Sequence, residues 1–283
     1  MNTARFRLSG DRMKKNSFFL SINPERCIGC GLCEKACRRF IFEKDSVTGS
    51  MNIRKDKIEL CMHCGHCLSV CPSFAVSLDG LTGEHLPEAA PCPSSSQLAD
   101  LLRGRRSTGC FSRRKPERKL LLEALADTAS APSASNMRTL CWKIIDDPER
   151  LERLRKELLP YYEPGGTKRL RSHYDNAVEG RDSLLRGAPC LIVAMTPVGA
   201  PWGPTDCAIA ITQLELTLLT RGIGSCWAGS VIQIARDHYL KELRLPEGYA
   251  ASGALMAGYP AIRYKRLPPR EHPPVLFNDD NTL

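Results

Sequence analysis

Two runs of four cysteines repeat one spacing near the start of the chain. They read Cys27-Ile-Gly-Cys30-Gly-Leu-Cys33-Glu-Lys-Ala-Cys37 and Cys61-Met-His-Cys64-Gly-His-Cys67-Leu-Ser-Val-Cys71. In the pattern C-x2-C-x2-C-x3-C, three thiolates on a tight loop hold three corners of an iron–sulfur cube, and the fourth cysteine serves the other cluster. The spacing therefore predicts two [4Fe–4S] clusters with crossed ligands. The expected sets are Cys27, Cys30, Cys33 and Cys71 for one cluster, and Cys61, Cys64, Cys67 and Cys37 for the other.

Zinc sites and disulfides are the alternative roles for so many cysteines. Structural zinc sites pair C-x2-C knuckles across longer gaps, and no secretory signal indicates an oxidising compartment. The doubled spacing, which is that of bacterial ferredoxins, favours iron and sulfur over both. His63 and His66 lie inside the second run, where the x2 spacing points them outward, so we expect tuning or surface roles for them. Arg38 stands where a proline often follows the first run.

Composition limits what the rest of the chain can do. The 283 residues give room for one small and one medium domain, with 42% hydrophobic and 25% charged residues as in ordinary globular proteins. No apolar run is long enough to cross a bilayer, so we expect no membrane partner and a cytoplasmic location. Eight Lys or Arg against one acid lie within residues 103–119. Only Phe111 is aromatic there, which disfavours nucleic acid and favours a site for a phosphate-bearing cofactor.

Changes in composition divide the chain into four segments. We expect residues 1–20 to be a flexible extension and residues 21–80 a ferredoxin-like unit of two pseudo-repeats. Residues 81–96 are rich in Gly, Pro and Ser and read as a linker. Residues 97–283 form the second domain.

Within this second domain, apolar periodicity predicts alternating helices and strands. Asp206 should be the N-cap, and Gly222 the C-cap, of a helix over 207–221 that is apolar nearly all round and must be covered on every side. Residues 188–195 should form a buried strand. Further expected elements are helices over 116–129, 148–158 and 235–244, a helix containing Leu184 and Leu185, and strands at 142–145 and 249–258.

Five short motifs in the second domain resemble those of the nitroreductase family of FMN-dependent oxidoreductases, and the whole chain resembles its branch with an N-terminal ferredoxin domain. The motifs are Arg105-Arg106-Ser107, Ala131-Pro132-Ser133-Ala134-Ser135-Asn136, Leu185-Arg186-Gly187-Ala188-Pro189, Gly222-Ile-Gly-Ser-Cys-Trp-Ala-Gly229 and Gly258-Tyr259-Pro260. Each is weak alone, but five in order are a strong signal. The resemblance implies an α+β fold class: a small 2[4Fe–4S] domain followed by an FMN domain with a central mixed sheet flanked by helices.

The resemblance also assigns residues to FMN. Guanidinium groups match a phosphate dianion with paired, charge-assisted hydrogen bonds, and the motif implies Arg105, Arg106 and Ser107 for the phosphate and ribityl end. From the C-terminal segment, Lys265 and Arg266 are the best matches for added phosphate contacts. The ring is assigned two further segments, one of small residues against its face and one with backbone amides at its N5 and O4 edge. These are Pro132, Ser133, Ala134, Ser135 and Asn136, and then Cys226, Trp227, Ala228 and Gly229.

Two positions depart from the family pattern. Gly109 stands where a basic residue is frequent, and Arg138 stands where a glutamine is usual. The simpler roles for the assigned residues are solvated charge for the arginines and core packing for Trp227 and Cys226. No catalytic side chain is assigned, because water or the flavin can supply protons.

The expected function is reduction of a small acceptor by two electrons, with the clusters relaying electrons to FMN. The family suggests nitroaromatics or quinones as acceptors, a homodimer with FMN at its interface, and either NAD(P)H or a ferredoxin-type carrier as donor. A non-catalytic electron carrier or redox sensor is the alternative from another class, although no added effector module is recognisable. Reductive dehalogenation on the same fold is a third alternative.

Overall fold

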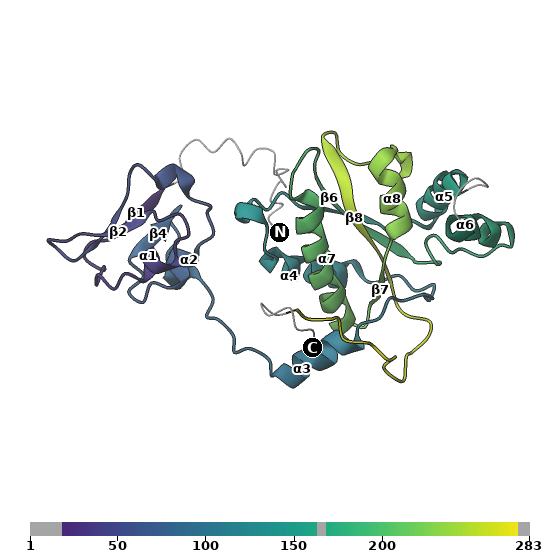
Figure 1. Cartoon of the computed structure of the whole chain (residues 1–283), viewed down its shortest axis with the longest axis horizontal. Coiled ribbons are helices and arrows are strands. Elements are labelled where there is room, and N and C mark those ends of the chain that lie inside the picture. The colour runs from purple at the N-terminus through teal and green to yellow at the C-terminus, as the bar shows by residue number, and fades with distance from the viewer. Residues whose placement is uncertain (1–18, 163–167, 277–283) are drawn as a thin grey trace.

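The computed structural model describes residues 19–162 and 168–276. The chain forms an N-terminal part that contains both cysteine runs and a larger C-terminal part built on one sheet, with an extended segment between them (Figure 1). No helix of the described residues is long and apolar enough to cross a membrane.

The N-terminal part repeats a loop, a short helix and a strand. Strand β1 (Leu20–Ile22) pairs with β4 (Val76–Leu78), and β2 (Phe42–Lys44) pairs with β3 (Met51–Ile53), both antiparallel. Helices α1 (Leu32–Ala36) and α2 (His66–Ser69) each begin inside a cysteine run. Gly31 and Gly65 precede them with φ of 74°, a backbone region that favours glycine. A 3-10 helix at Ile58–Leu60 leads into the second run, and another follows at Gly83–His85.

The C-terminal part alternates helices with the strands of one sheet. Its helices are α3 (Ser95–Gly104), α4 (Arg118–Asp127), α5 (Pro148–Leu158), α6 (Lys168–Val178), α7 (Gly203–Thr220) and α8 (Gly229–Asp237). Its strands are β5 (Cys141–Ile145), β6 (Cys190–Pro197), β7 (Gly224–Trp227) and β8 (Tyr249–Gly258), in the spatial order β5-β6-β8-β7. These four strands pair antiparallel, and an isolated parallel bridge joins Ser107 to Ser225.

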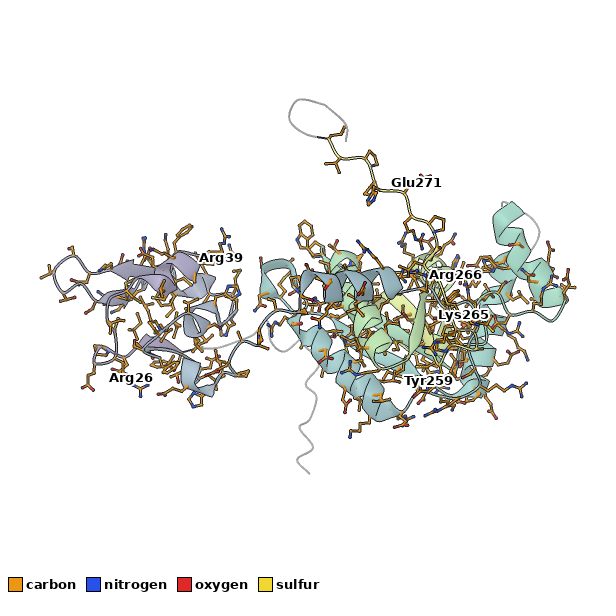
Figure 2. The ribbon with its side chains drawn as sticks, turned by 90° about the horizontal axis from the view of Figure 1, so that it is seen from below. Arg26, Arg39, Tyr259, Lys265, Arg266 and Glu271 are labelled. Atoms are coloured by element: carbon orange, nitrogen blue, oxygen red, sulfur yellow. The ribbon has the colours of Figure 1, made fainter. Side chains whose placement is uncertain are left out.

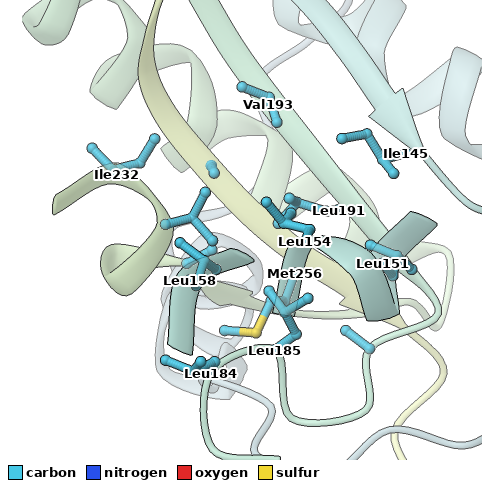
Figure 3. Close-up of a cluster of buried hydrophobic side chains, with 14 of the residues drawn as sticks. Ile145, Leu151, Leu154, Leu158, Leu184, Leu185, Leu191, Val193, Ile232 and Met256 are labelled. Carbon is cyan, nitrogen blue, oxygen red and sulfur yellow. The ribbon is translucent and has the colours of Figure 1, made fainter. Parts of the chain in front are cut away.

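Two apolar layers cover the faces of this sheet. Side chains alternate along β6 as a strand requires: Ile192 packs with α4 and α7, while Val193 packs with α5 and α8. Figure 3 shows the second layer, where Leu154 and Leu158 of α5 are fully buried. Burial of each such leucine contributes about 1.5–3 kcal/mol. The predicted strand over 188–195 is therefore confirmed as the buried centre of the sheet.

Three local expectations differ from the structure. Asp206 is not an N-cap, because α7 begins at Gly203, where a side chain would meet Thr196 Oγ1 at 2.4 Å. Leu184 and Leu185 are not helical; the carboxylate of Asp182 accepts their backbone N–H groups and holds a turn. The helix expected over 235–244 is instead α8 followed by a 3-10 helix at Lys241–Leu243.

Gly222 follows α7 with φ of 71°, and its N–H donates to the carbonyl of Leu219. It therefore ends the helix as expected.

Candidate functional site

The fourth cysteine of each run lies near cysteines of the other run. Burial raises the pKa of Cys67 to about 12, and the neighbouring thiols of Cys61, Cys64 and Cys37 add to the shift. Burial likewise raises the pKa of Cys33 to about 11, with Cys30 and Cys71 adding to it. Such mutual effects need short distances, so Cys37 lies near Cys61 and Cys67 of the second run, and Cys71 lies near Cys33 of the first.

These proximities suit the crossed ligand sets that the sequence predicts for iron–sulfur cubes. All fourteen cysteines carry free thiols, and among the described residues no three His, Cys, Asp or Glu side chains converge as ligands of one metal ion would. A cube spreads its four thiolates over separate corners rather than around one ion. The backbone N–H of Ala75 donates to Cys71 Sγ at 3.2 Å, the kind of bond that tunes a cluster. Cys27 is half-buried beside the core of this part, and Cys30 is exposed.

Arg105 and Arg106 line a cavity of about 480 Å³ together with Glu215, Ser225 and Arg263. We call it the arginine cavity. Arg105 Nη1 lies 3.4 Å from Glu215 Oε1, and the hydroxyl of Ser225 donates to the same oxygen at 3.2 Å. A pocket with several guanidinium groups and few acids suits an anion such as phosphate.

Arg106 carries a polar atom that has no partner in the described part of the chain. Its Nη1 donates to the carbonyls of Arg103 and Arg105 at 2.6 Å, but its Nε is buried without a hydrogen bond. Buried donors are nearly always paired in folded proteins. Since Arg106 lines the arginine cavity, the unpaired Nε fits a ligand that brings oxygen acceptors.

Ser107 and the segment after it join the arginines to β7. The N–H of Thr108 donates to the carbonyl of Ser225 at 2.8 Å, which completes the bridge between Ser107 and Ser225. Burial raises the pKa of the Cys226 thiol, and a hydrogen bond with the Ser107 side chain opposes the shift. The arginine motif and residues 226–229, which are both assigned to FMN, are therefore adjacent.

Residues 132–136, which we call the small-residue loop, lie at the start of α7. Asp206, buried in the first turn of this helix, accepts the N–H of Ala134 through Oδ1 at 3.0 Å. The loop is strained: Ser135 and Asn136 have φ of 49° and 55°, and Arg138 follows with 50°. Non-glycine residues rarely adopt this region, and such strain clusters at functional sites.

Along α7, Trp227 lies between the level of the small-residue loop and the level of Glu215. A side chain at Gly253 of β8 would meet Ile211 of α7 at 2.4 Å and the Trp227 ring at 3.3 Å. Trp227 is 39% exposed, so part of this residue is open for contact. Ala228 is fully buried, and Gly229 begins α8.

The assigned segments meet helix α7 at three successive levels. The small-residue loop meets it at Asp206, Trp227 lies near Ile211, and Arg105 meets it at Glu215. Asp206 and Glu215 are nine positions apart, which is about 14 Å along a helix and two and a half turns around it, so the loop and Arg105 meet opposite faces of α7.

Lys265 and Arg266 lie elsewhere. Both are exposed on the extended segment after β8, outside the lining of the arginine cavity (Figure 2). Arg263 and Tyr264 of the same segment line the cavity instead. The basic residues in the sequence identified this segment, but they did not identify Arg263 as the one that lines the cavity.

Arg186 is a second residue that sequence reasoning missed. A side chain at Gly109 would lie 3.5 Å from Arg186 Nη1, and the charge of Arg186 acts on Cys226. The basic group absent at position 109 is thus replaced in space by one from another motif, Leu185–Pro189.

The N-terminal part touches the small-residue loop. Asn136 Nδ2 donates to the carbonyl of Met62 at 2.9 Å, and Arg39 Nη2 donates to Ser135 Oγ at 3.3 Å. Arg39 lies on the side of the N-terminal part that faces the rest of the chain (Figure 2). Beside these bonds is a cavity of about 520 Å³, which we call the seam cavity.

Comparison with known proteins agrees with this architecture. Residues 102–259 match the Nitroreductase family, and residues 26–75 match a 4Fe-4S dicluster domain. The chain belongs to the nitroreductase family. This nitroreductase-family chain is therefore an oxidoreductase that carries an iron–sulfur domain, and its α+β fold class is confirmed.

Solved structures show the same fold for the C-terminal part. An FMN-bound nitroreductase from Bacteroides fragilis is 24% identical, with a TM-score of 0.53, and the match covers 61% of this chain and 95% of that one. An FMN-bound nitroreductase from Desulfitobacterium hafniense is 23% identical, with a TM-score of 0.52 and coverage of 61% and 93%. An iodotyrosine deiodinase bound to FMN and 3-iodo-L-tyrosine is 22% identical, with a TM-score of 0.50 and coverage of 64% and 98%.

Proposed function

We propose that this protein is an FMN-dependent reductase in which two [4Fe–4S] clusters relay electrons to the flavin for reduction of a small acceptor such as a nitroaromatic or a quinone. The arginine cavity, with the buried and unpaired Nε of Arg106, carries this proposal. The second cysteine run lies against the small-residue loop, which is the segment assigned to the flavin ring. When bound, FMN exchanges electrons singly or in pairs, which lets one-electron clusters serve a two-electron reduction.

The residues have distinct roles in this proposal. Arg105 and Arg106 bind the FMN phosphate, with Arg263 as an additional cation from the C-terminal segment and Ser107 at the ribityl chain. The small-residue loop lies against the ring, because small side chains let the backbone approach a flat surface. The N–H of Ala228 donates to the carbonyl of Ala254 at 2.8 Å, so any backbone N–H that residues 226–229 offer to the ring edge comes from a neighbour of Ala228. A donor at that edge favours the reduced anion.

Homodimer formation is part of the proposal. The face of α7 that points away from the sheet carries Ile209, Leu216 and Leu219, which the single chain leaves half-buried. A second copy covering this face would remove that apolar surface from water. Sedimentation of the purified protein would test this, and a monomer at micromolar concentration would contradict it.

The role of the iron–sulfur clusters depends on which electron donor the protein uses. We propose a ferredoxin-type carrier in a reducing cytoplasm, with NAD(P)H as the alternative donor directly to the flavin. Full-rate reduction of the flavin by NADH in a Cys30→Ser variant would refute the relay, because the route through the clusters would then be unnecessary.

Anaerobic purification tests the proposal as a whole. We expect eight irons and one FMN per chain, and rapid reoxidation of the reduced flavin on mixing with a nitroaromatic. Zinc without flavin would overturn the proposal. Bound cofactors without reoxidation by any nitroaromatic or quinone would favour a carrier or sensor instead.

A further inference from the structure

The second cysteine run, and not the first, lies against the small-residue loop. Met62, whose carbonyl accepts from Asn136, stands directly after Cys61. Cys64 lines the seam cavity together with residues of the loop. As the structure describes this cavity, none of Cys27, Cys30, Cys33 and Cys71 lines it. The two cysteine groups are therefore not equivalent with respect to the loop.

Asn136 is held in one orientation at this contact. Its Oδ1 accepts from Arg138 Nε at 3.0 Å, and its Nδ2 donates to the carbonyl of Met62 at 2.9 Å. If the amide were flipped, a donor would face a donor and an acceptor would face an acceptor, so only this orientation satisfies both partners. Asn136 is half-buried; the bond with Arg138 fixes its amide, and the bond to Met62 links the loop to the second run.

Strained backbone faces the contact from both sides. His63, next to Met62, has φ of 52°, and Ser135 and Asn136 have φ of 49° and 55°. Such conformations are costly and persist where the surrounding structure imposes them. Both strained segments meet at the hydrogen bond between Asn136 and Met62, which indicates that the geometry of this contact matters.

We propose that the cluster held by Cys37, Cys61, Cys64 and Cys67 is the one that delivers electrons to the flavin, and that Asn136 is the positioning residue that holds it there. This inference rests on the proposed function. Each transfer moves one electron from that cluster to the flavin, and two transfers with one proton from solvent complete the reduction. A low-potential one-electron reductant replaces each electron through the cluster of Cys27, Cys30, Cys33 and Cys71.

Asn136→Asp is the sharpest test, because aspartate keeps the size of the side chain and the acceptor for Arg138 but cannot donate to Met62. The matched control is Asn176→Asp, since Asn176 Oδ1 also accepts from an arginine Nε at 3.0 Å, far along the chain at Arg181. Losing one such bond is worth about tenfold in the docked population. We expect Asn136→Asp to slow flavin reduction by a ferredoxin-type donor about tenfold, and the control to leave it unchanged.

A readout without turnover accompanies the kinetics. In the oxidised holoprotein, amide hydrogen exchange should quicken in residues 61–66 and 132–138 of Asn136→Asp, while residues 26–33 keep the exchange rate of the wild type. Iron content should stay that of the wild type, and the rates are compared for protein that carries FMN. Unchanged exchange at the contact together with unchanged flavin reduction would overturn the positioning role.

Ligand variants identify the cluster. With a small one-electron reductant that reaches either cluster, Cys64→Ser should abolish the fast, cluster-dependent phase of flavin reduction, and Cys30→Ser should retain it. The opposite pattern, in protein that binds FMN and iron, would overturn this inference while the proposed function stands. Wild-type protein that binds no FMN would instead refute the proposed function itself.

Discussion

Substitution of a charged residue in the arginine cavity should alter binding of the FMN phosphate but not binding of the rest of the flavin. Arg105 is the clearest target, because its side chain is 29% exposed and its partner Glu215 is 14% exposed. Solvent therefore screens both charges only in part. We expect Arg105→Gln to weaken FMN binding and to leave binding of riboflavin, which lacks the phosphate, nearly unchanged.

The expected size follows from the hydrogen bonds that Arg105 would make. A bond to a charged group contributes about 1.5–3 kcal/mol, and each 1.4 kcal/mol is about tenfold in affinity. FMN affinity should therefore fall by about 10- to 150-fold. Glu215→Gln should act in the opposite direction, because it removes a negative charge beside the phosphate yet keeps an acceptor for Arg105 and Ser225. A gain of up to about 1 kcal/mol, or about fivefold, is expected.

Titration of the apoprotein with each flavin, followed by quenching of flavin fluorescence, measures all the affinities. The ratio of the FMN to the riboflavin dissociation constant is the decisive quantity, because a general loss of folding would affect both. Equal weakening of the two flavins in Arg105→Gln would refute a phosphate role for the cavity. Weaker FMN binding in Glu215→Gln would show that Glu215 supports the site rather than opposes the phosphate.

Three further predictions concern the elements around α7. Asp206→Ala should lower the free energy of unfolding by about 1.5–3 kcal/mol, because it removes the buried acceptor that anchors the small-residue loop; Asp206→Asn should cost less in the same chemical denaturation. Gly253→Ala should cost about 1–3 kcal/mol and shift tryptophan fluorescence, since the new Cβ would stand 2.4 Å from Ile211. An unshifted spectrum would contradict the packing. Burial raises the pKa of Cys190 and Cys207 from 9.0 to about 12. The unfolded thiols lose protons first as pH rises, so stability should fall progressively between pH 9 and 12. A flat profile from pH 9 to 11 would contradict this.

The cysteine runs show what spacing alone can predict. Their loops are short, so each helix must start within its run, and Gly31 and Gly65 take the left-handed conformation that the turn needs. Strand β6 was predictable for a similar reason, because a continuous apolar run fits only the centre of a covered sheet. In both cases local sequence and tertiary structure impose the same conformation. The assignment of individual ligands to each cluster stays a prediction.

Residues that act through distant contacts were harder to predict. Asp206 has the residue type of an N-cap, but close packing of Gly203 on Thr196 extends α7 and leaves Asp206 to anchor the loop. Among the basic residues after β8, the sequence favoured Lys265 and Arg266, while the path of the extended segment brings Arg263 to the cavity. Neither outcome is encoded within a few residues, because each depends on which surface the segment meets.

The departure at Arg138 acquires a physical reason from the contact between the two parts. Its Nε holds Oδ1 of Asn136, and this fixes the amide so that Nδ2 faces Met62. The neutral amide of a glutamine can present either its oxygen or its nitrogen to Asn136, so it would not select one orientation of the pair. A guanidinium can only donate, and therefore it forces the oxygen of Asn136 inward and the nitrogen toward the iron–sulfur part. The small-residue loop binds the second cysteine run through a single asparagine. An arginine at position 138 holds that asparagine in the orientation that this contact requires.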